Sequence, residues 1–188
     1  MADDYFGQVG LASCPAGLRL TITQNPNTPS TILRTADRGP SVPTAAGSEA
    51  LLTKGSIDRL HTPEVGHGCY SRYFLVPKKN RGLHPILDHH PLNAFLQKVK
   101  FKMLILAQVL FAQDPGDWTV ALDLQDAYFH IPVLQAHRRY LSFTVGQEHF
   151  QFAVLLFDLT SAPQVFVKVI VVVTAHLRRS GVPVFPYL

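Results

Sequence analysis

The stretch Ala121-Leu122-Asp123-Leu124-Gln125-Asp126-Ala127-Tyr128-Phe129-His130-Ile131-Pro132 is the most informative part of the chain. It completes an alternation of apolar residues that runs from Trp118 to Leu124 and predicts a buried strand. Asp123 and Asp126 come where that strand ends, and two hard oxygen ligands close together suit Mg²⁺. The same residues also fit a plainer arrangement, in which Asp126 caps a helical turn and Asp123 faces water. The Asp-x-x-Asp spacing alone leaves both alternatives open.

Two β-hairpins are predicted, one on each side of this stretch. Each consists of two runs rich in aromatic and β-branched residues, separated by turn residues. In the second hairpin the turn is Gly146-Gln147, and glycine in its first position suits a type II′ turn. In the first hairpin Pro85 has to lie at a sheet edge or irregularity, because proline cannot donate a ladder hydrogen bond. The predicted strands are Tyr70–Pro77 and Leu83–Asp88, which flank the basic turn Lys78–Gly82, and Tyr140–Val145 and Glu148–Val154.

Helices are predicted before, between and after the hairpins. Ser48–Gly55 begins with a candidate N-cap serine and ends with a glycine, which are start and stop signals of a short helix. Leu92–Lys100 reads as a short amphipathic piece, and Met103–Ala112 reads as a helix. In Gln164–Leu177 the local rules conflict, because its many valines favour a strand whereas its length and the preceding Ser161-Ala162-Pro163 favour a helix.

Composition separates the first 47 residues from the rest. Residues 1–47 are rich in proline, serine and threonine without a sustained period, so we expect weak order there and a folded domain over 48–188. The 188 residues include 47% apolar and 16% charged residues, which excludes a disordered charged tail and a coiled coil. Two cysteines are too few for a disulfide framework or a cysteine-rich zinc site. No signal peptide or membrane span is evident, so we expect an intracellular protein of the cytoplasm or nucleus.

The positive charge is concentrated in one window of the chain. The whole chain has a net charge of +4, whereas residues 72–102 contain seven basic residues and one acid, Asp88, for a net charge of +6. A basic hairpin beside aromatic residues suits a phosphate backbone or a triphosphate, although the charge alone favours the plainer explanation, a solvated face. The basic residues are Arg72, Lys78, Lys79, Arg81, Lys98, Lys100 and Lys102.

Several segments, in the same order along the chain, resemble reverse transcriptases. The 121–132 stretch resembles motif A, Phe157–Phe166 resembles motif B, and Gly68–Lys79 resembles the entry to the fingers. Leu83–Asp88, continued by Pro91-Leu92-Asn93, and Pro115–Trp118 fit the same pattern. The likeness is greatest to polymerases of DIRS-like retrotransposons, with gypsy-like enzymes more distant, and it covers residues 48–188.

The resemblance implies an α+β fold: a partial right-hand polymerase, with an antiparallel palm sheet and helices on one face. The fingers would span residues 48–113 and the palm 114–188, and Gln164–Leu177 would be a helix. The family carries out template-directed nucleotidyl transfer with Mg²⁺ or Mn²⁺ on a primer–template of RNA or DNA, with dNTPs as substrates. Asp123 would hold the metals, and Tyr128 would be the steric gate against a ribose 2′-hydroxyl. Nucleotide contacts would come from Lys78, Lys79, Asp126, Ala127, Tyr128 and Gln164, and nucleic-acid contacts from Arg72, Arg81, Lys98, Lys100 and Lys102.

The chain also departs from the family pattern. Pro186-Tyr187-Leu188 stands where the family continues into the Asp-Asp pair of motif C, so we expect a truncated element copy that lacks part of the palm, the thumb and the RNase H region. His84 replaces an arginine, His89-His90-Pro91 replaces a Leu-Arg-Arg-like stretch, and Asp158 replaces a glycine. We therefore expect no polymerase activity from these residues. A non-catalytic nucleic-acid-binding remnant, or a polyprotein fragment known through its RNase H domain, is the alternative.

Overall fold

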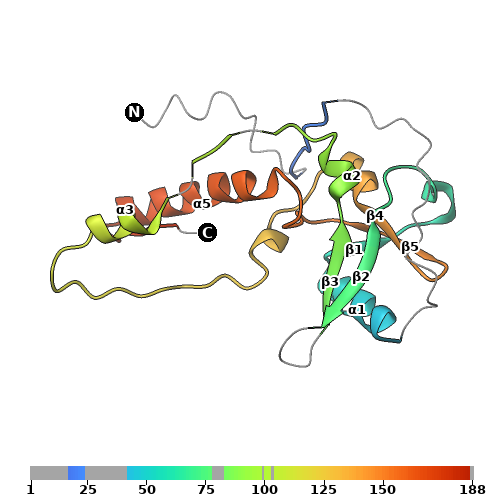
Figure 1. Cartoon of the computed structure of the whole chain (residues 1–188), viewed down its shortest axis with the longest axis horizontal. Coiled ribbons are helices and arrows are strands. Elements are labelled where there is room, and N and C mark those ends of the chain that lie inside the picture. The colour runs from blue at the N-terminus through green and yellow to red at the C-terminus, as the bar shows by residue number, and fades with distance from the viewer. Residues whose placement is uncertain (1–16, 24–41, 78–82, 99, 103, 187–188) are drawn as a thin grey trace.

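A computed structural model describes residues 17–23, 42–77, 83–98, 100–102 and 104–186 (Figure 1). The fold is α+β with antiparallel sheets, as predicted. The elements are α1 (Val42–Thr53), β1 (Ile57–Arg59), η2 (Thr62–Glu64), β2 (Arg72–Pro77), β3 (Leu83–Asp88), α2 (His90–Asn93), α3 (Leu106–Phe111), η3 (Ala127–His130), α4 (Gln135–Arg138), η4 (Arg139–Leu141), β4 (Ser142–Val145), β5 (Glu148–Phe152) and α5 (Ala162–Arg179). The division into fingers and palm stays a prediction.

Both predicted hairpins are confirmed. β2 and β3 pair from Arg72 opposite Asp88 to Pro77 opposite Leu83, and the basic turn between them lies outside the described residues. β4 and β5 pair around Gly146, whose φ of 61° agrees with the first position of a type II′ turn. β1 adds to the other edge of β5, which gives the strand order β1-β5-β4. Alternating apolar residues and a local turn were sufficient to predict these pairs.

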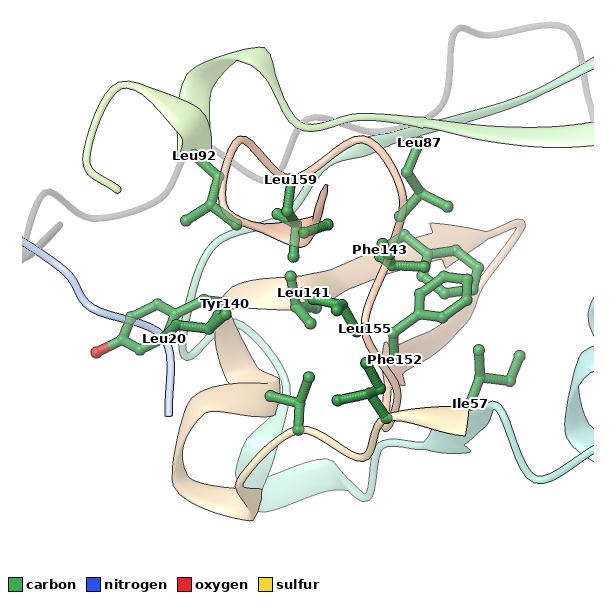
Figure 2. Packing of buried hydrophobic residues seen from close by; sticks show 14 of the residues in the cluster. Leu20, Ile57, Leu87, Leu92, Tyr140, Leu141, Phe143, Phe152, Leu155 and Leu159 are labelled. Carbon is green, nitrogen blue, oxygen red and sulfur yellow. The ribbon is translucent and has the colours of Figure 1, made fainter. Parts of the chain in front are cut away.

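The two sheets are joined where β4 begins. Ser71 N donates a hydrogen bond to Ser142 O over 2.8 Å, and Ser142 N donates to Cys69 O over 3.2 Å. Phe143 lies at the centre of the resulting core, with its ring centroid 4.9 Å from that of Tyr73 and 5.3 Å from that of Phe152. Figure 2 shows Phe143 and Phe152 beside Leu155. This core fixes the strands from which the candidate site extends.

Part of the segment expected to be weakly ordered belongs to the fold. Leu18 N donates to Pro132 O over 2.7 Å, and Leu134 N donates back to Leu18 O over 2.8 Å. Leu20 is only 3% exposed and belongs to the core. The prediction of weak order over 1–47 is therefore wrong for residues 17–23, because alternate apolar side chains there supply core contacts that composition does not reveal. Helix α1 begins at Val42, within the segment that composition sets apart.

The helix predicted over Ser48–Gly55 starts earlier than expected. Ser48 lies within α1 and is no N-cap, so the start signal was misread. The stop was correct, since Gly55 has a φ of 66° and Ser56 N donates to Leu51 O over 3.0 Å, as in a Schellman ending. α3 is shorter than the predicted helix 103–112, and the predicted piece 92–100 contributes the single turn α2.

The valine-rich segment is helical, as the resemblance implied. α5 spans 18 residues from Ala162 to Arg179. Pro163 lies in its first turn, where a missing N–H costs nothing. Val165 and Phe166 are buried in the core, so tertiary packing outweighs the preference of valine for strands.

The strand predicted over 118–124 is not formed. Trp118 is 99% exposed and Leu122 is 88% exposed. Figure 1 shows the chain between α3 and η3 as a long arc away from the sheets. A strand needs a neighbouring strand as the hydrogen-bond partner of its backbone N–H and C=O groups. No described strand lies beside residues 118–124. The alternation was read correctly, but burial depends on a partner that these residues do not provide.

Candidate functional site

The 121–132 stretch changes character in its middle. Its first half, with Asp123, is exposed, whereas its end is joined to the chain that follows β5. Leu155 N donates to Ile131 O and Val133 N donates to Ala153 O, both over 2.8 Å. Ala127 and Tyr128 in the second half therefore pack against the core, whereas Asp123 and Asp126 are exposed.

Asp126 marks the point where the chain returns to the body. It has a φ of 50° and a ψ of 38°, the left-handed region that few non-glycine residues occupy. Its Oδ2 accepts a hydrogen bond from Lys54 Nζ over 2.7 Å, and both side chains are about half exposed. The carboxylate does not cap η3, although Phe129 N donates to the Asp126 backbone oxygen over 2.8 Å. Asp126 thus has a lysine partner, and the plainer sequence alternative was right about Asp123 facing water.

The η3 turn brings Tyr128 against α5. The ring centroids of Tyr128 and Phe166 are 5.1 Å apart, and burial raises the pKa of the Tyr128 hydroxyl above its usual value. Ala127 is half-buried in the same turn, and Gln164 is buried in the first turn of α5. The motif A-like and motif B-like segments therefore meet at Tyr128 and Phe166.

A second junction connects α2 with the loop before α5. Asn93 Nδ2 donates to the backbone oxygen of Asp158, and Asn93 Oδ1 accepts from the backbone N–H of Thr160, both over 2.8 Å. One side chain thus satisfies two backbone groups of the motif B-like segment. The Pro91-Leu92-Asn93 segment is thereby fixed to the same region as the 157–166 segment.

His89 and Asp158, two positions where the sequence departs from the pattern of the family that it resembles, are in contact. The backbone N–H of His89 donates to Asp158 Oδ2 over 3.2 Å, and the His89 Nδ1 atom lies 3.6 Å from the same oxygen. The imidazole is fully buried, and neither ring nitrogen has a hydrogen-bond partner among the described residues. Burial lowers the pKa of His89 to about 4, and the opposing attraction of Asp158 and Asp88 is too weak to restore it. The ring is therefore neutral at pH 7.

Within the basic window 72–102, the basic residues that the structure describes face solvent. Arg72 is exposed on β2 opposite Asp88, and Lys98, Lys100 and Lys102 are exposed in the segment that follows α2. The other members of the basic window, Lys78, Lys79 and Arg81, lie outside the described residues, as does the side chain of His84. Exposed lysines at alternate positions can reach a phosphate backbone without giving up internal ion pairs.

The described carboxylates do not fit a metal centre. No three His, Cys, Asp or Glu side chains of the described residues lie together in a way that could hold an ion. Asp123 is exposed, and the nearest carboxylate along the chain, Asp126, is paired with Lys54. Two-metal chemistry requires ligands that hold two ions about 3.5–4 Å apart. The described carboxylates therefore do not form the ligand set that two ions of Mg²⁺ or Mn²⁺ would need.

Sequence reasoning missed Lys54, Asn93 and Phe166 as parts of this region. Lys54 belongs to none of the motif-like segments, and Asn93 appears only as the last residue of Pro91-Leu92-Asn93. Their partners are 72 and 65 residues away along the chain, so no local pattern indicates the contacts.

In the described part of the chain no helix is long and apolar enough to cross a membrane.

No family model matches this sequence. Over 107 residues, 57% of this chain, it is 26% identical to the Transposon Tf2-3 polyprotein and equally to the Transposon Tf2-7 polyprotein, both of Schizosaccharomyces pombe (strain 972 / ATCC 24843). The matched region spans 8% of the length of these relatives. The similarity supports an origin in a retrotransposon polyprotein.

Proposed function

We propose that these residues form the fingers and part of the palm of a reverse transcriptase within a retroelement polyprotein. The similarity to transposon polyproteins supports the retroelement origin. The observation that carries the finer proposal is the convergence of three motif-like segments: Tyr128 packs on Phe166, and Asn93 bonds to Asp158 and Thr160. Segments far apart in the chain that meet in this way are what a nucleotide site between fingers and palm requires.

In this proposal the residues of the η3 turn and of α5 position a nucleotide. The backbone around Asp126 and Ala127 lies under the triphosphate, Tyr128 packs against the sugar, and Gln164 lies beside the template. Lys78 and Lys79 contact the triphosphate from the fingers. These roles rest on the resemblance. They agree with the partial burial of the Tyr128 ring against Phe166, a contact that would favour one orientation of a steric gate.

We further propose that this polypeptide by itself does not transfer nucleotides. In a complete polymerase, metal ions neutralise the phosphates and align the attacking hydroxyl. Among the described residues, no three His, Cys, Asp or Glu side chains gather into such a ligand set, and Asp126 is paired with Lys54. The function that remains is non-catalytic binding of nucleic acid, which the exposed Lys98, Lys100 and Lys102 favour.

A primer-extension assay tests the absence of catalysis. The purified chain is incubated with a DNA primer on an RNA template, dNTPs, and either Mg²⁺ or Mn²⁺. Asp123→Ala is the informative variant, and Asp114→Ala is the matched control at another exposed carboxylate outside the proposed site. We expect no extension by any of the three. Template-dependent extension that Asp123→Ala abolishes and Asp114→Ala retains would overturn the proposal.

A further inference from the structure

An open hollow of about 390 Å³ lies where the segment that contains Leu20 passes beside α4 and η4. Figure 2 shows Tyr140 beside Leu20, with the Tyr140 hydroxyl turned away from the other labelled core residues. No aspartate or glutamate of the described residues lines the hollow, so its polar lining consists of cationic and neutral side chains. The lining residues are Arg19, Leu20, Thr21, Ile22, His137 and Tyr140.

The His137 imidazole presents a hydrogen-bond donor in this hollow. The backbone N–H of Leu20 donates to His137 Nδ1 over 2.8 Å. A neutral imidazole that accepts at Nδ1 carries its proton on Nε2. Burial lowers the pKa of His137, and the charges of Arg19 and Arg139 lower it further, so the ring is neutral at pH 7. No described residue accepts a hydrogen bond from Nε2, so this N–H is available to a ligand.

Two guanidinium groups add positive charge beside the His137 ring. Arg139 Nη2 donates to the Tyr140 hydroxyl over 2.8 Å, and Arg139 Cζ lies 4.9 Å from the centroid of the Tyr140 ring. Arg19 is exposed and lines the hollow itself. Neither Arg19 nor Arg139 takes part in an ion pair among the described residues, where the paired arginines are at other positions. Two unpaired positive charges therefore lie beside one neutral donor.

We propose that this hollow binds a backbone phosphate of a nucleic-acid strand, through the guanidinium groups of Arg19 and Arg139 and the Nε2–H of His137. A guanidinium group matches the geometry of phosphate oxygens and keeps its charge at every pH of interest. The imidazole adds a donor to the same oxygens. Because the hollow is open, a phosphate that belongs to a longer chain can enter it while the sugars on either side stay in solvent.

The position of the hollow favours a strand over a free phosphate ion. Gln97 N donates to Thr21 O over 3.0 Å, in an antiparallel bridge that sets Ile22 opposite Leu96. Lys98, the first of the three exposed lysines, follows directly in the chain. A strand with regularly spaced phosphates can therefore contact both the hollow and the lysines, which a single phosphate ion cannot do. In this respect the inference rests on the proposed binding of nucleic acid.

Nuclear magnetic resonance of the His137 ring tests the site. The histidines of the chain are labelled with 15N, and the signals of His137 are assigned as those that His137→Gln removes. The ligand is a single-stranded oligothymidylate of about eight nucleotides. We expect the His137 Nε2 signal to shift and to saturate with the oligonucleotide. Inorganic phosphate should produce the same shift only at a much higher concentration, and saturation at an equal or lower concentration would overturn the assignment to a strand.

The salt dependence of oligonucleotide binding tests the arginines. Arg19→Gln should make the slope of log K against log salt shallower by about 0.7, the contribution of one phosphate contact to a single strand. Arg179→Gln, at the exposed end of α5, is the matched control and should leave the slope unchanged. Because the Arg19 side chain is exposed, the near-ultraviolet circular dichroism of Arg19→Gln should match that of the parent chain.

Failure of this inference and failure of the proposed function give different results. Oligonucleotide binding that leaves the His137 signal unmoved, or that has the same slope for the parent and Arg19→Gln, would overturn the site in the hollow and leave the proposed function intact. A shift of His137 and a weaker Arg19→Gln, together with an unchanged Lys98→Gln/Lys100→Gln/Lys102→Gln variant, would support the hollow and contradict the lysine contacts. No binding of the oligonucleotide by the parent would overturn both.

Discussion

His89 and Asp158, where the sequence departs from the reverse transcriptase pattern that it resembles, lie against each other, with His89 Nδ1 3.6 Å from Asp158 Oδ2. The His89 backbone N–H donates to the same carboxylate oxygen over 3.2 Å. A glycine at position 158 would leave this N–H without that acceptor. The Asp158 side chain therefore provides a hydrogen bond to the segment that contains His89.

The burial of His89 makes stability depend on pH. An unfolded histidine titrates near pH 6.5, whereas the folded His89 has a pKa of about 4. Between these values the unfolded chain binds more protons, so the free energy of unfolding falls as the pH falls from about 6.5 to about 4. The loss attributable to His89 is on the order of 3 kcal/mol, and urea denaturation at several pH values would measure it. His89→Gln should flatten this part of the profile, and an unchanged slope would contradict the assignment.

Asp126 provides a test of backbone strain. Asp126→Gly and Asp126→Ala both remove the ion pair with Lys54, which is exposed and worth at most about 1 kcal/mol. They differ in the cost of the φ of 50°, which glycine adopts freely and alanine does not. We expect the alanine variant to be less stable than the glycine variant by about 1–2 kcal/mol in urea denaturation. Equal stabilities would show that Asp126 does not hold this conformation.

Asn93 should be sensitive to both of its hydrogen bonds. Asn93→Ala removes the donor to Asp158 O and the acceptor for Thr160 N, and we expect a loss of about 1–3 kcal/mol in thermal or urea unfolding. Asn93→Asp keeps the acceptor and should lose less. Gln97→Ala is the control, because the Gln97 side chain is exposed and has no hydrogen-bond partner among the described residues, and it should change stability by at most about 0.5 kcal/mol. If both Asn93 variants changed stability no more than Gln97→Ala does, the two Asn93 hydrogen bonds would not contribute to the stability of the fold.

The sequence predicted what neighbouring residues determine. The strands on both sides of Gly146 and the stop at Gly55 follow from side-chain alternation and from glycine conformation, and both are present. The strand over 118–124 failed for the opposite reason, because its formation depends on a partner strand and not on its own residues. The core position of Leu20 was not predicted, because composition describes the average of a segment. Three alternate side chains, Leu18, Leu20 and Ile22, are enough to attach this segment to the core.

The candidate site was predicted less completely than the fold. Tyr128 and Gln164 were predicted from motifs. The structure brings their segments together, because Tyr128 packs against Phe166 of α5, the helix that contains Gln164. Contacts such as Asn93 with Thr160 or His89 with Asp158 join residues more than 60 positions apart, and a single sequence contains no periodic signal for them. The role of Asp123 stays a prediction, since its side chain is exposed and apart from any cluster of ligands in the described residues.

The salt dependence of primer–template binding tests the central claim most directly. A labelled RNA–DNA hybrid is titrated with the chain at several KCl concentrations, and the slope of log K against log salt is compared with that of a Lys98→Gln/Lys100→Gln/Lys102→Gln variant. Arg179→Gln, at the exposed end of α5, is the control. We predict salt-sensitive binding by the parent chain and a slope shallower by about 0.9 for each phosphate contact that the triple variant loses, with the control unchanged. Undetectable binding, or the same slope for the parent and the triple variant, would contradict the account.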